Sequence, residues 1–575
     1  MPIANADVVA VFTEIADLLE IENANPFRVR AYRNAARMLG ELGRDVSTMV
    51  AEPESLDALP GIGPDLAAKI VEIVATGSCA LLERLRQELP VGLSELLKIP
   101  GLGPRRVRLL HQELGIATLA QLRQAAQEKR VQTVHGFGSR SEQRILEATN
   151  TLLLEAPRYK HADLEPQAQA LLADLASLPG VHTALAAGSL RRGRETVGDI
   201  DLLVTCDAPR AVMDHLAEGP EVQRVLQKGI TRCSVVLKRG VQVDLRAVAP
   251  VSLGAASLYF TGSKAHNIAL RQRAQEQGLK LNEYGLYRGR QRVAGDSEAA
   301  VYAALGLPYI EPELREDRGE IAAAAAGTLP RLVQRSDLQG DLHAHTKDSD
   351  GHDGLQAMAE AARAQGLHYL AITDHSKRLA LLHGLDADAL SRQIDRIDAV
   401  NAGLRDFVLL KGVEVDILED GSLDLPQAVL RRLDLVVGAI HSGFGLSRAQ
   451  QTQRLLRAMD SPCFSLLAHP SGRLINERQA CDLDLAQVIR KAAERGCFLE
   501  LNAHPARLDL DDTACRMAKD AGVLVSINSD AHSHLQFDNL RHGISQARRG
   551  WLEASDVLNT RTLEQLRPLL KRTMG

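Results

Sequence analysis

The stretch GSLRRGRETVGDID, residues 188–201, decides the fold of this chain. A strand turns successive side chains to opposite faces, so Asp199 and Asp201 point the same way. Two neighbouring carboxylates repel each other unless a cation lies between them. The Gly-Ser turn and the basic cluster before them suit a triphosphate, and the carboxylates suit the Mg²⁺ that accompanies it. The stretch therefore predicts a metal-binding strand edge beside a phosphate-binding turn.

The composition bounds the class of protein. At 575 residues the chain is too long for one core, and we expect roughly three to five domains. Its 45% hydrophobic and 25% charged residues are typical of a soluble globular protein. The formal net charge is −5, yet residues 101–310 carry 27 Lys/Arg against 20 Asp/Glu. A basic central block suits a polyanion partner, the alternative being an ordinary surface of mixed charge.

Several absences exclude other classes. The seven cysteines include no C-x-x-C pair, which favours a reducing cytosol over a disulfide framework. The N-terminus lacks the basic and apolar regions of a signal peptide, and no apolar run approaches 18 residues, about the length that a membrane span needs. We therefore expect a cytoplasmic protein that does not enter a membrane.

The pattern changes along the chain. Residues 5–20 and 27–42 have helical periodicity, and an α/β pattern begins with a helix at 165–177. The stretch 311–337 is acidic and then Ala-rich and predicts a linker with some helix. From Gly340 onward, short apolar strands alternate with helices, as in a β/α barrel. The expected strands are 181–187, 200–205, 232–238 and 241–248, and later 369–373, 407–410, 435–440, 464–468, 498–502 and 524–528.

The pattern apolar-Pro-Gly-x-Gly-Pro precedes a helix twice, at 59–64 and 99–104, with a weaker third copy at 134–139. Glycine tolerates the tight turn, which leaves backbone N–H groups at a helix N-terminus where a phosphate can bind. The pattern resembles helix-hairpin-helix motifs, which hold nucleic-acid backbones without reading sequence. A helix-to-helix turn without a ligand is the alternative. The candidate DNA contacts are Gly61, Gly63, Gly101 and Gly103.

A third carboxylate, Asp244, lies on the later strand VQVDLR, residues 241–246. With 188–201 it is similar to the palm signature of the family X DNA polymerases. The runs YFTGS at 259–263 and LNEYG at 281–285 resemble the nucleotide-sensing thumb motifs of that family. The resemblance covers roughly residues 1–315.

The resemblance implies a role for each of these residues. Asp199 and Asp201 would bridge two Mg²⁺ or Mn²⁺ ions, and Asp244 would hold the catalytic metal and help to deprotonate the primer 3′-hydroxyl. Two metals can clamp the attacking and leaving oxygens of phosphoryl transfer. The implied nucleotide contacts are Ser189, Arg192 and Gly198 at the β,γ-phosphates, Tyr259, Phe260 and Gly262 at the sugar, and Asn267 at the base edge.

Two lysines bear on further properties of the family. Lys264 departs from its pattern, because vertebrate relatives carry an acidic residue that contacts the incoming base. Lys69 aligns with the Schiff-base lysine of the family's 5′-deoxyribose-phosphate lyase. Such a lysine needs a depressed pKa, whereas the nearby Asp65 and Glu72 are acidic. A solvated helix lysine is the alternative.

The C-terminal part is rich in metal-ligand types. His343 and His345 form an H-x-H pair on one face of a strand, and each later strand ends in another ligand type. Ligands at the carboxyl ends of successive barrel strands converge on the barrel mouth. Nine positions exceed what one ion binds, so two or three ions are implied, and Zn²⁺ or Mn²⁺ suits this set. The nine are His343, His345, Asp350, His375, Glu414, His441, His469, Asp530 and His532.

This run resembles a PHP domain (polymerase and histidinol phosphatase) over about 338–575, and the ligands of that family map onto the same nine positions. The resemblance implies an active metallo-phosphoesterase, whose metal would supply a hydroxide for attack on a phosphoester. His504 is outside the set, and we expect it to face the substrate without binding metal.

With both resemblances in this order, the chain is identified as a member of the bacterial and archaeal family X DNA polymerases with a C-terminal PHP domain. The expected fold is multidomain. It has a helical DNA-binding domain at 1–85 and fingers at 86–150, each with a helix-hairpin-helix, then an α/β nucleotidyltransferase palm at 151–253, a thumb at 254–315, a linker at 316–337 and a PHP-type (β/α) barrel at 338–575.

The resemblance implies a repair polymerase that fills short gaps, as in base excision repair, and a barrel that trims 3′ ends as a metal-dependent 3′–5′ exonuclease. PHP domains of this family are also associated with abasic-site endonuclease and 3′-phosphatase activity. The expected partners are gapped or primer-template DNA and dNTPs, and we expect a monomer. Two alternatives stay open: a small-molecule phosphatase with a decayed polymerase region, and a non-catalytic scaffold for DNA ends.

Overall fold

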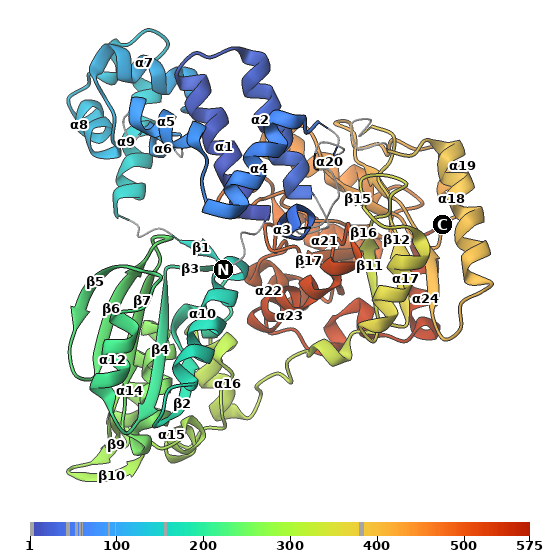
Figure 1. The fold of residues 1–575 in the computed structure, drawn as a ribbon. Coiled ribbons are helices and arrows are strands. Elements are labelled where there is room, and N and C mark those ends of the chain that lie inside the picture. The colour runs from blue at the N-terminus through green and yellow to red at the C-terminus, as the bar shows by residue number, and fades with distance from the viewer. Residues whose placement is uncertain are drawn as a thin grey trace. The chain divides into compact units, whose positions relative to one another are not determined.

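The computed structural model describes residues 5–41, 46–51, 56, 59, 61–89, 93–97, 99, 101–154, 158–378 and 384–575. Pro60 and Pro100 of the glycine hairpins lie outside these residues. The chain forms two compact units, Met1–Pro157 and Arg158–Gly575, whose elements are labelled in Figure 1. Each unit has its own apolar cores. Within the part of the chain that the structure describes, no helix is both long and apolar enough to cross a membrane.

The N-terminal unit is helical throughout its described part. One apolar core gathers around Phe12, Ile15 and Ile70, and a second gathers around Leu110 and Leu122. The apolar residue between the two glycines of each hairpin is buried in these cores. The helices are α1 (Asn5–Ile21), α2 (Pro26–Glu41), α3 (Val46–Ala51), α4 (Pro64–Thr76), α5 (Ala80–Glu88), α6 (Leu93–Leu96), α7 (Pro104–Leu114), α8 (Leu119–Gln127) and α9 (Ser139–Leu154).

The palm is a five-stranded sheet in the order β2-β4-β7-β6-β5. β4 pairs with β2 antiparallel and with β7 parallel, so its two neighbours cover both of its edges. The strands are β2 (Val181–Ala186), β4 (Asp199–Cys206), β5 (Val222–Lys228), β6 (Arg232–Leu237) and β7 (Gln242–Ala247), with a small pair β1 (Tyr159–Lys160) and β3 (Thr196–Val197). The palm helices are α10 (His161–Ala176), α11 (Gly188–Arg191) and α12 (Pro209–Ala217).

The thumb packs three helices on a three-stranded sheet in the order β10-β9-β8. Residues 316–337, expected as a linker, include α16 and contribute to the same core. Glu320 of α16 is buried and accepts a 2.6 Å hydrogen bond from Nδ1 of His266. The elements are α13 (Leu253–Thr261), α14 (Lys264–Glu276), β8 (Lys280–Asn282), β9 (Gly285–Arg288), β10 (Gln291–Ala294), α15 (Glu298–Ala304) and α16 (Glu320–Ala326).

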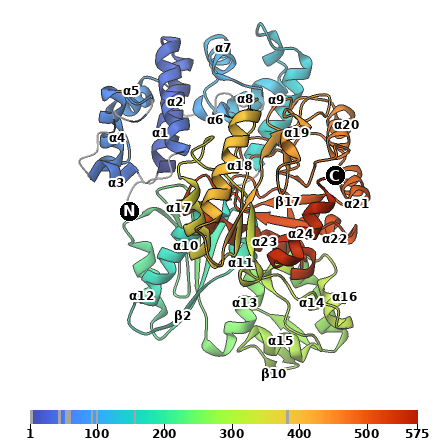
Figure 2. The same ribbon diagram turned by 90° about the vertical axis from the view of Figure 1, so that its right-hand side faces the viewer.

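The C-terminal barrel is built from parallel strands in two runs, β11-β12-β13 and β14-β15-β16-β17-β18. Bridges at His375–Glu414 and Ala344–Ala531 join the two runs, and the helices lie around the strands (Figure 2). The strands are β11 (Gly340–Ala344), β12 (Tyr369–Ile372), β13 (Val408–Lys411), β14 (Glu414–Asp416), β15 (Val437–Ala439), β16 (Leu466–Leu467), β17 (Phe498–Asn502) and β18 (Val525–Asn528). The helices are α17 (Leu355–Ala364), α18 (Ala387–Asn401), α19 (Gln427–Leu430), α20 (Arg448–Met459), α21 (Leu485–Arg495), α22 (Asp512–Asp520), α23 (Leu540–Arg549) and α24 (Leu563–Arg572).

Candidate active sites

Three carboxylates meet on adjacent strands of the palm. Asp199 and Asp201 lie on β4, and the parallel register sets Asp201 directly opposite Asp244 of β7. Each of the three offers an oxygen within 4.8 Å of the others. The alternation of β4 turns Ile200 into the core while its two aspartates stay half-buried on the other face. The sheet therefore forms a cluster of oxygen donors.

Burial and mutual repulsion oppose full ionisation of this cluster. Burial, followed by the charges of Asp199 and Asp244, raises the pKa of Asp201 to about 7. Burial and then the charge of Asp244 raise the pKa of Asp199. A divalent cation between these oxygens would relieve the repulsion, and carboxylate oxygens are the donors that Mg²⁺ and Mn²⁺ prefer. The residues present therefore fit such an ion.

Residues not expected from the sequence hold the third carboxylate in place. Ser234 of β6 and Gln242 of β7 donate hydrogen bonds to Asp244, the latter at 2.7 Å, and a guanidinium nitrogen of Arg232 lies 3.5 Å away. The register sets Ser234 opposite Asp244. A polar residue in the apolar strand 232–237 was the available signal.

Gly188 is required beside the carboxylates. Its φ is +62°, and a Cβ there would lie 2.1 Å from Oδ2 of Asp201. Any larger residue would both strain the backbone and displace that carboxylate. The glycine of the 188–201 stretch therefore gives the aspartate room.

The expected phosphate contacts lie around the same loop. Ser189 is in α11, and Gly198 separates β3 from β4. Arg192, just after α11, donates to the backbone carbonyl of Thr261 and, at 3.0 Å, to Glu316. It is thus held between palm and thumb, and it would have to leave a protein partner to bind a phosphate.

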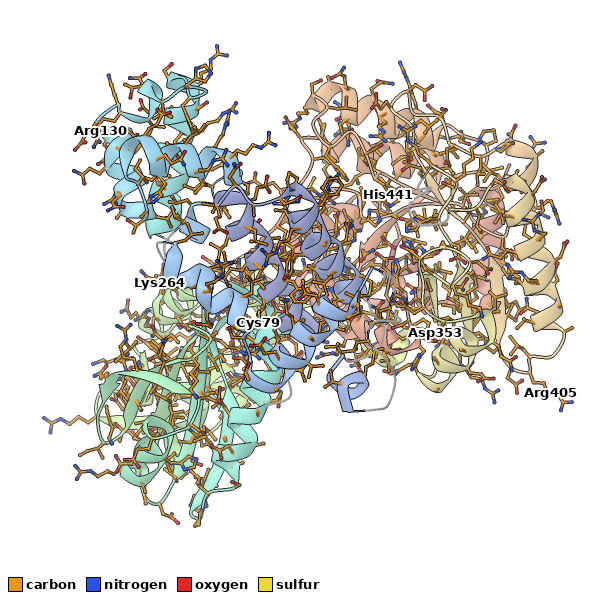
Figure 3. The ribbon with its side chains drawn as sticks, turned by 45° about the horizontal axis from the view of Figure 1, so that its top comes forward. Cys79, Arg130, Lys264, Asp353, Arg405 and His441 are labelled. Atoms are coloured by element: carbon orange, nitrogen blue, oxygen red, sulfur yellow. The ribbon has the colours of Figure 1, made fainter. Side chains whose placement is uncertain are left out.

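The expected sugar and base contacts come from α13 and α14. Tyr259 and Asn267 line one small pocket, where the amide of Asn267 donates a 2.7 Å hydrogen bond to the carbonyl of Tyr259. Phe260 faces the palm instead, with the guanidinium of Arg246 4.4 Å from its ring centroid. Gly262 ends α13 with φ +71°. Lys264 is exposed at the start of α14 and is labelled in Figure 3.

The nine expected ligands of the barrel come together, and most of them lie at or just after the carboxyl ends of its strands. Eight of them form three overlapping groups, and the donor atoms within each group lie within 4.8 Å of one another. The ninth, His469, places Nε2 2.9 Å from Glu414. Glu414 also approaches His375 and His441, which is labelled in Figure 3, at 2.7 and 3.2 Å. The groups are His345, Asp350, His375 and His532; His343, His345 and Asp530; and His375, Glu414 and His441.

The barrel cluster fits metal ions. Nε2 of His343, both ring nitrogens of His345 and Oε2 of Glu414 are buried and make no hydrogen bond among the described residues. Such groups are costly to bury unless something binds them. A set of imidazoles and carboxylates is the donor chemistry of Zn²⁺ and Mn²⁺ sites.

Several known protein families match parts of this chain. Residues 256–316 match the DNA polymerase beta thumb, and 341–504 match the PHP domain. Residues 3–79 match a helix-hairpin-helix domain, and 93–151 match a SAM-like helix-hairpin-helix tandem. The chain is 38% identical over 570 residues to the DNA polymerase/3′-5′ exonuclease PolX of Bacillus subtilis (strain 168), an alignment that covers 98% of this chain and 99% of that protein.

The chain belongs to the family X DNA polymerases with a C-terminal PHP domain. The family and the multidomain fold class expected from the sequence are thereby confirmed. Two further relatives align with part of this chain. A probable phosphatase of Thermoanaerobacter sp. (strain X514) is 28% identical over 233 residues, which is 38% of this chain and 89% of that protein. DNA polymerase lambda of Rattus norvegicus is 27% identical over 324 residues, 50% of this chain and 52% of that protein.

Charged and polar groups surround the ligands of the PHP barrel in this family X chain. Glu500 of β17 accepts a 2.7 Å hydrogen bond from Nδ1 of His343, and Asp416 lies 3.1 Å from Nδ1 of His441. Such partners fix the orientation of ligand imidazoles. They were not expected from the sequence, although a glutamate inside the apolar strand 498–502 was a signal.

His504 does not join the metal groups found among the described residues. It is half-buried, and its Nδ1 accepts a 3.2 Å hydrogen bond from the backbone N–H of Ala506. Burial lowers its pKa to about 4. A neutral side chain that faces the substrate remains a prediction.

The three glycine hairpins of the polymerase share the conformation of their first glycine. Their first glycines, Gly61, Gly101 and Gly136, have φ of +80°, +85° and +87°. Gly63 and Gly103 are the N-cap residues of α4 and α7. The third copy, weaker in sequence, thus makes the same left-handed turn, which glycine adopts without strain.

Lys69 is paired rather than free. Its Nζ lies 2.5 Å from a carboxylate oxygen of Asp65. Burial favours the neutral amine, but hydrogen bonding to Asp65 and the nearby Tyr32 outweigh it and raise the pKa of Lys69. A protonated amine cannot form an imine, so this environment works against a Schiff-base role.

Proposed function

We propose that this polymerase fills short DNA gaps in repair and that its PHP barrel trims 3′ ends as a metal-dependent 3′–5′ exonuclease. The observation that carries the proposal is the presence, in one chain, of two complete and separate ligand clusters, one in the palm and one in the barrel. The relative that aligns over nearly its whole length bears both activities in its name.

In the palm, Asp199, Asp201 and Asp244 would hold Mg²⁺ or Mn²⁺, which when bound supplies positive charge to the attacking and leaving oxygens. Asp244 would accept the proton of the primer 3′-hydroxyl. Ser189, Arg192 and Gly198 would hold the β,γ-phosphates of a dNTP. Burial makes a cationic donor such as Arg192 stronger there than in water.

In the barrel, the nine ligands would hold two or three Zn²⁺ or Mn²⁺ ions, which when bound supply an activated water for attack on a phosphoester. Glu500 and Asp416 would keep the imidazoles of His343 and His441 in the tautomer that leaves Nε2 free. The cluster is buried, so only the end of a strand could reach it. A strand terminus fits this limit, and the name of the full-length relative favours the 3′ end.

The glycine hairpins would bind the DNA backbone through the N–H groups at the starts of α4, α7 and α9. Gapped or primer-template DNA is the proposed partner. We also propose that the protein is cytoplasmic and acts as a monomer. The likeness of part of this chain to a probable phosphatase favours 3′-phosphatase as an additional activity of the barrel.

A labelled primer on a one-nucleotide gap tests the proposal. The parent protein should extend it with dNTPs and shorten it without them, in Mg²⁺ or Mn²⁺. Asp199→Ala should abolish extension and spare shortening, and His343→Ala should do the reverse. Exposed residues supply matched controls, Asp207→Ala in the palm and His534→Ala in the barrel, which should change neither reaction. If either site variant loses both activities while it stays folded, the two-site assignment fails.

A further inference from the structure

A third ligand cluster lies where the palm meets the barrel. It consists of His161 and Glu165 of α10 and His542 of α23, and their donor atoms lie within 4.8 Å of one another. His161 and Glu165 are four residues apart, so they share one face of the helix. Helices α10 and α23 lie side by side in both ribbon views (Figures 1 and 2).

One ring nitrogen of His161 has a hydrogen-bond acceptor beside it. Its Nε2 lies 3.2 Å from the carbonyl oxygen of Leu190. A carbonyl only accepts, so Nε2 carries the proton and Nδ1 keeps its lone pair. Imidazoles that bind metals usually donate their other N–H to a carbonyl or carboxylate, which fixes the tautomer.

Among the described residues, His542 makes no side-chain hydrogen bond. It is 7% exposed, and among the described residues its ring contacts that of His161, with centroids 6.1 Å apart and planes at 74°. Burial lowers the pKa of both histidines, that of His542 to about 4.

We propose that His161, Glu165 and His542 bind one Zn²⁺ ion that joins the palm to the barrel. Two imidazoles and a carboxylate are a set that Zn²⁺ favours, with about 2 Å from the ion to each donor and a fourth position for water. Arg541 donates to Oε2 of Glu165, which leaves the other carboxylate oxygen for the ion.

The position gives this ion a role distinct from that of the two catalytic clusters. Lys160, next to His161, pairs with Glu477 of the barrel at 2.6 Å, and the amide of Asn476 donates to the carbonyl of Arg158 at 2.9 Å. The ion would thus fasten the start of α10 to a surface that already holds the palm and barrel together. Its ligands come from both sides, so it can bind only when the two are docked.

Metal content of the full chain tests the site. Protein stripped with a chelator, reloaded with Zn²⁺ and freed of excess ion is analysed by mass spectrometry for zinc bound per chain. His542→Ala and Glu165→Gln should each bind one ion fewer than the parent. The control His215→Ala removes a half-exposed palm histidine that pairs with Asp174 and should bind as many ions as the parent.

A double variant separates zinc lost from the proposed site from zinc lost because the barrel cluster is disturbed. Adding His542→Ala to His343→Ala should remove one further ion, and no further loss would overturn the proposal. Equal zinc in the parent and both single variants would also overturn it. If His542→Ala does not fold, as judged by circular dichroism, Glu165→Gln alone decides, because it keeps the side-chain shape. Anomalous scattering at the zinc edge should give a peak between His161 and His542, and its absence in a loaded crystal would refute the site.

Discussion

Arg473 of the barrel holds both carboxylate oxygens of Glu195 in the palm, with hydrogen bonds of 2.6 and 3.2 Å from its two terminal nitrogens. Glu195 lies inside the 188–201 stretch, between the basic cluster and the aspartates. Nearby, Arg549 of α23 donates a 2.9 Å hydrogen bond to the carbonyl of Arg192. The barrel therefore supports the loop that we assign to the triphosphate.

This pair should contribute measurably to stability. Both partners are partly buried, and a two-pronged guanidinium–carboxylate contact is stronger than a single surface pair. We expect a double-mutant cycle of Arg473→Ala and Glu195→Gln to give a coupling energy of about 1–2 kcal/mol in urea unfolding. The more exposed pair Lys228–Asp214 in the palm is the control and should give a smaller coupling energy. Equal coupling in the two cycles would contradict the role of the contact.

Gly188→Ala should disable the polymerase alone. The added Cβ would collide with the carboxylate of Asp201, and displacement of a reacting group by about 1 Å can reduce a rate roughly 100-fold. We expect a loss of that size in gap filling, with the exonuclease unchanged. Gly278→Ala is matched, because φ there is +69° and a Cβ would meet nothing within 4 Å. Gly278→Ala strains the backbone in the same way but causes no collision, so this variant should keep the polymerase rate of the parent. Parent-like extension by Gly188→Ala would refute the argument.

Much of both sites could be predicted from local patterns. The alternation around Asp199 and Asp201 is enough to define a strand with two carboxylates on one face, and β4 is that strand. The barrel was predictable because a ligand type follows each apolar run. Asp530 and His532 lie beyond the segment that matches the PHP domain, yet the ring of strands brings them beside His345.

Contacts across long sequence separations could not be predicted in this way. Arg473 and Glu195 are 278 residues apart, and neither has a local pattern that identifies its partner. Residues 316–337 are acidic and Ala-rich, a composition typical of a linker, but Glu320 is buried against His266. The composition of a segment shows whether it could be exposed to solvent. It does not show which distant residues bury it in the folded chain.

Glu500→Gln should weaken the barrel and spare the palm. Glu500 is fully buried and accepts hydrogen bonds from Nδ1 of His343 and, at 2.8 Å, from the backbone N–H of His469. Loss of such a partner typically costs 10–100-fold in metal affinity or activity. We expect that loss in 3′ shortening measured against metal concentration, with gap filling unchanged. The exposed Glu494→Gln on α21 is the control. A variant with full exonuclease activity at limiting metal would show that Glu500 does not orient the ligand.

The stability of the thumb should decrease at low pH because of Glu298. This buried carboxylate accepts paired hydrogen bonds of 2.9 and 3.0 Å from Arg315 and of 2.7 and 2.8 Å from Arg191. Burial alone would raise the pKa of Glu298, but these two guanidiniums outweigh it and hold the pKa well below its usual range. The native state then keeps the charge at pH values where the unfolded chain takes up a proton.

The stabilisation is therefore complete above the unfolded pKa of about 4.3 and is lost as pH falls below it. Glu298→Gln leaves two guanidiniums unpaired, one of them fully buried, and should cost about 3–5 kcal/mol at pH 7. Below about pH 4 the difference in the free energy of unfolding between parent and variant should shrink by up to about 1.4 kcal/mol per pH unit. Fluorescence of Trp551, the single tryptophan, reports unfolding in urea because its ring packs in the thumb core. The control variant Glu276→Gln, at an exposed position, should unfold with the same free energy as the parent at every pH. If the difference in unfolding free energy between the parent and Glu298→Gln stays constant from pH 7 to pH 3, the carboxylate is not held ionised by its two arginines.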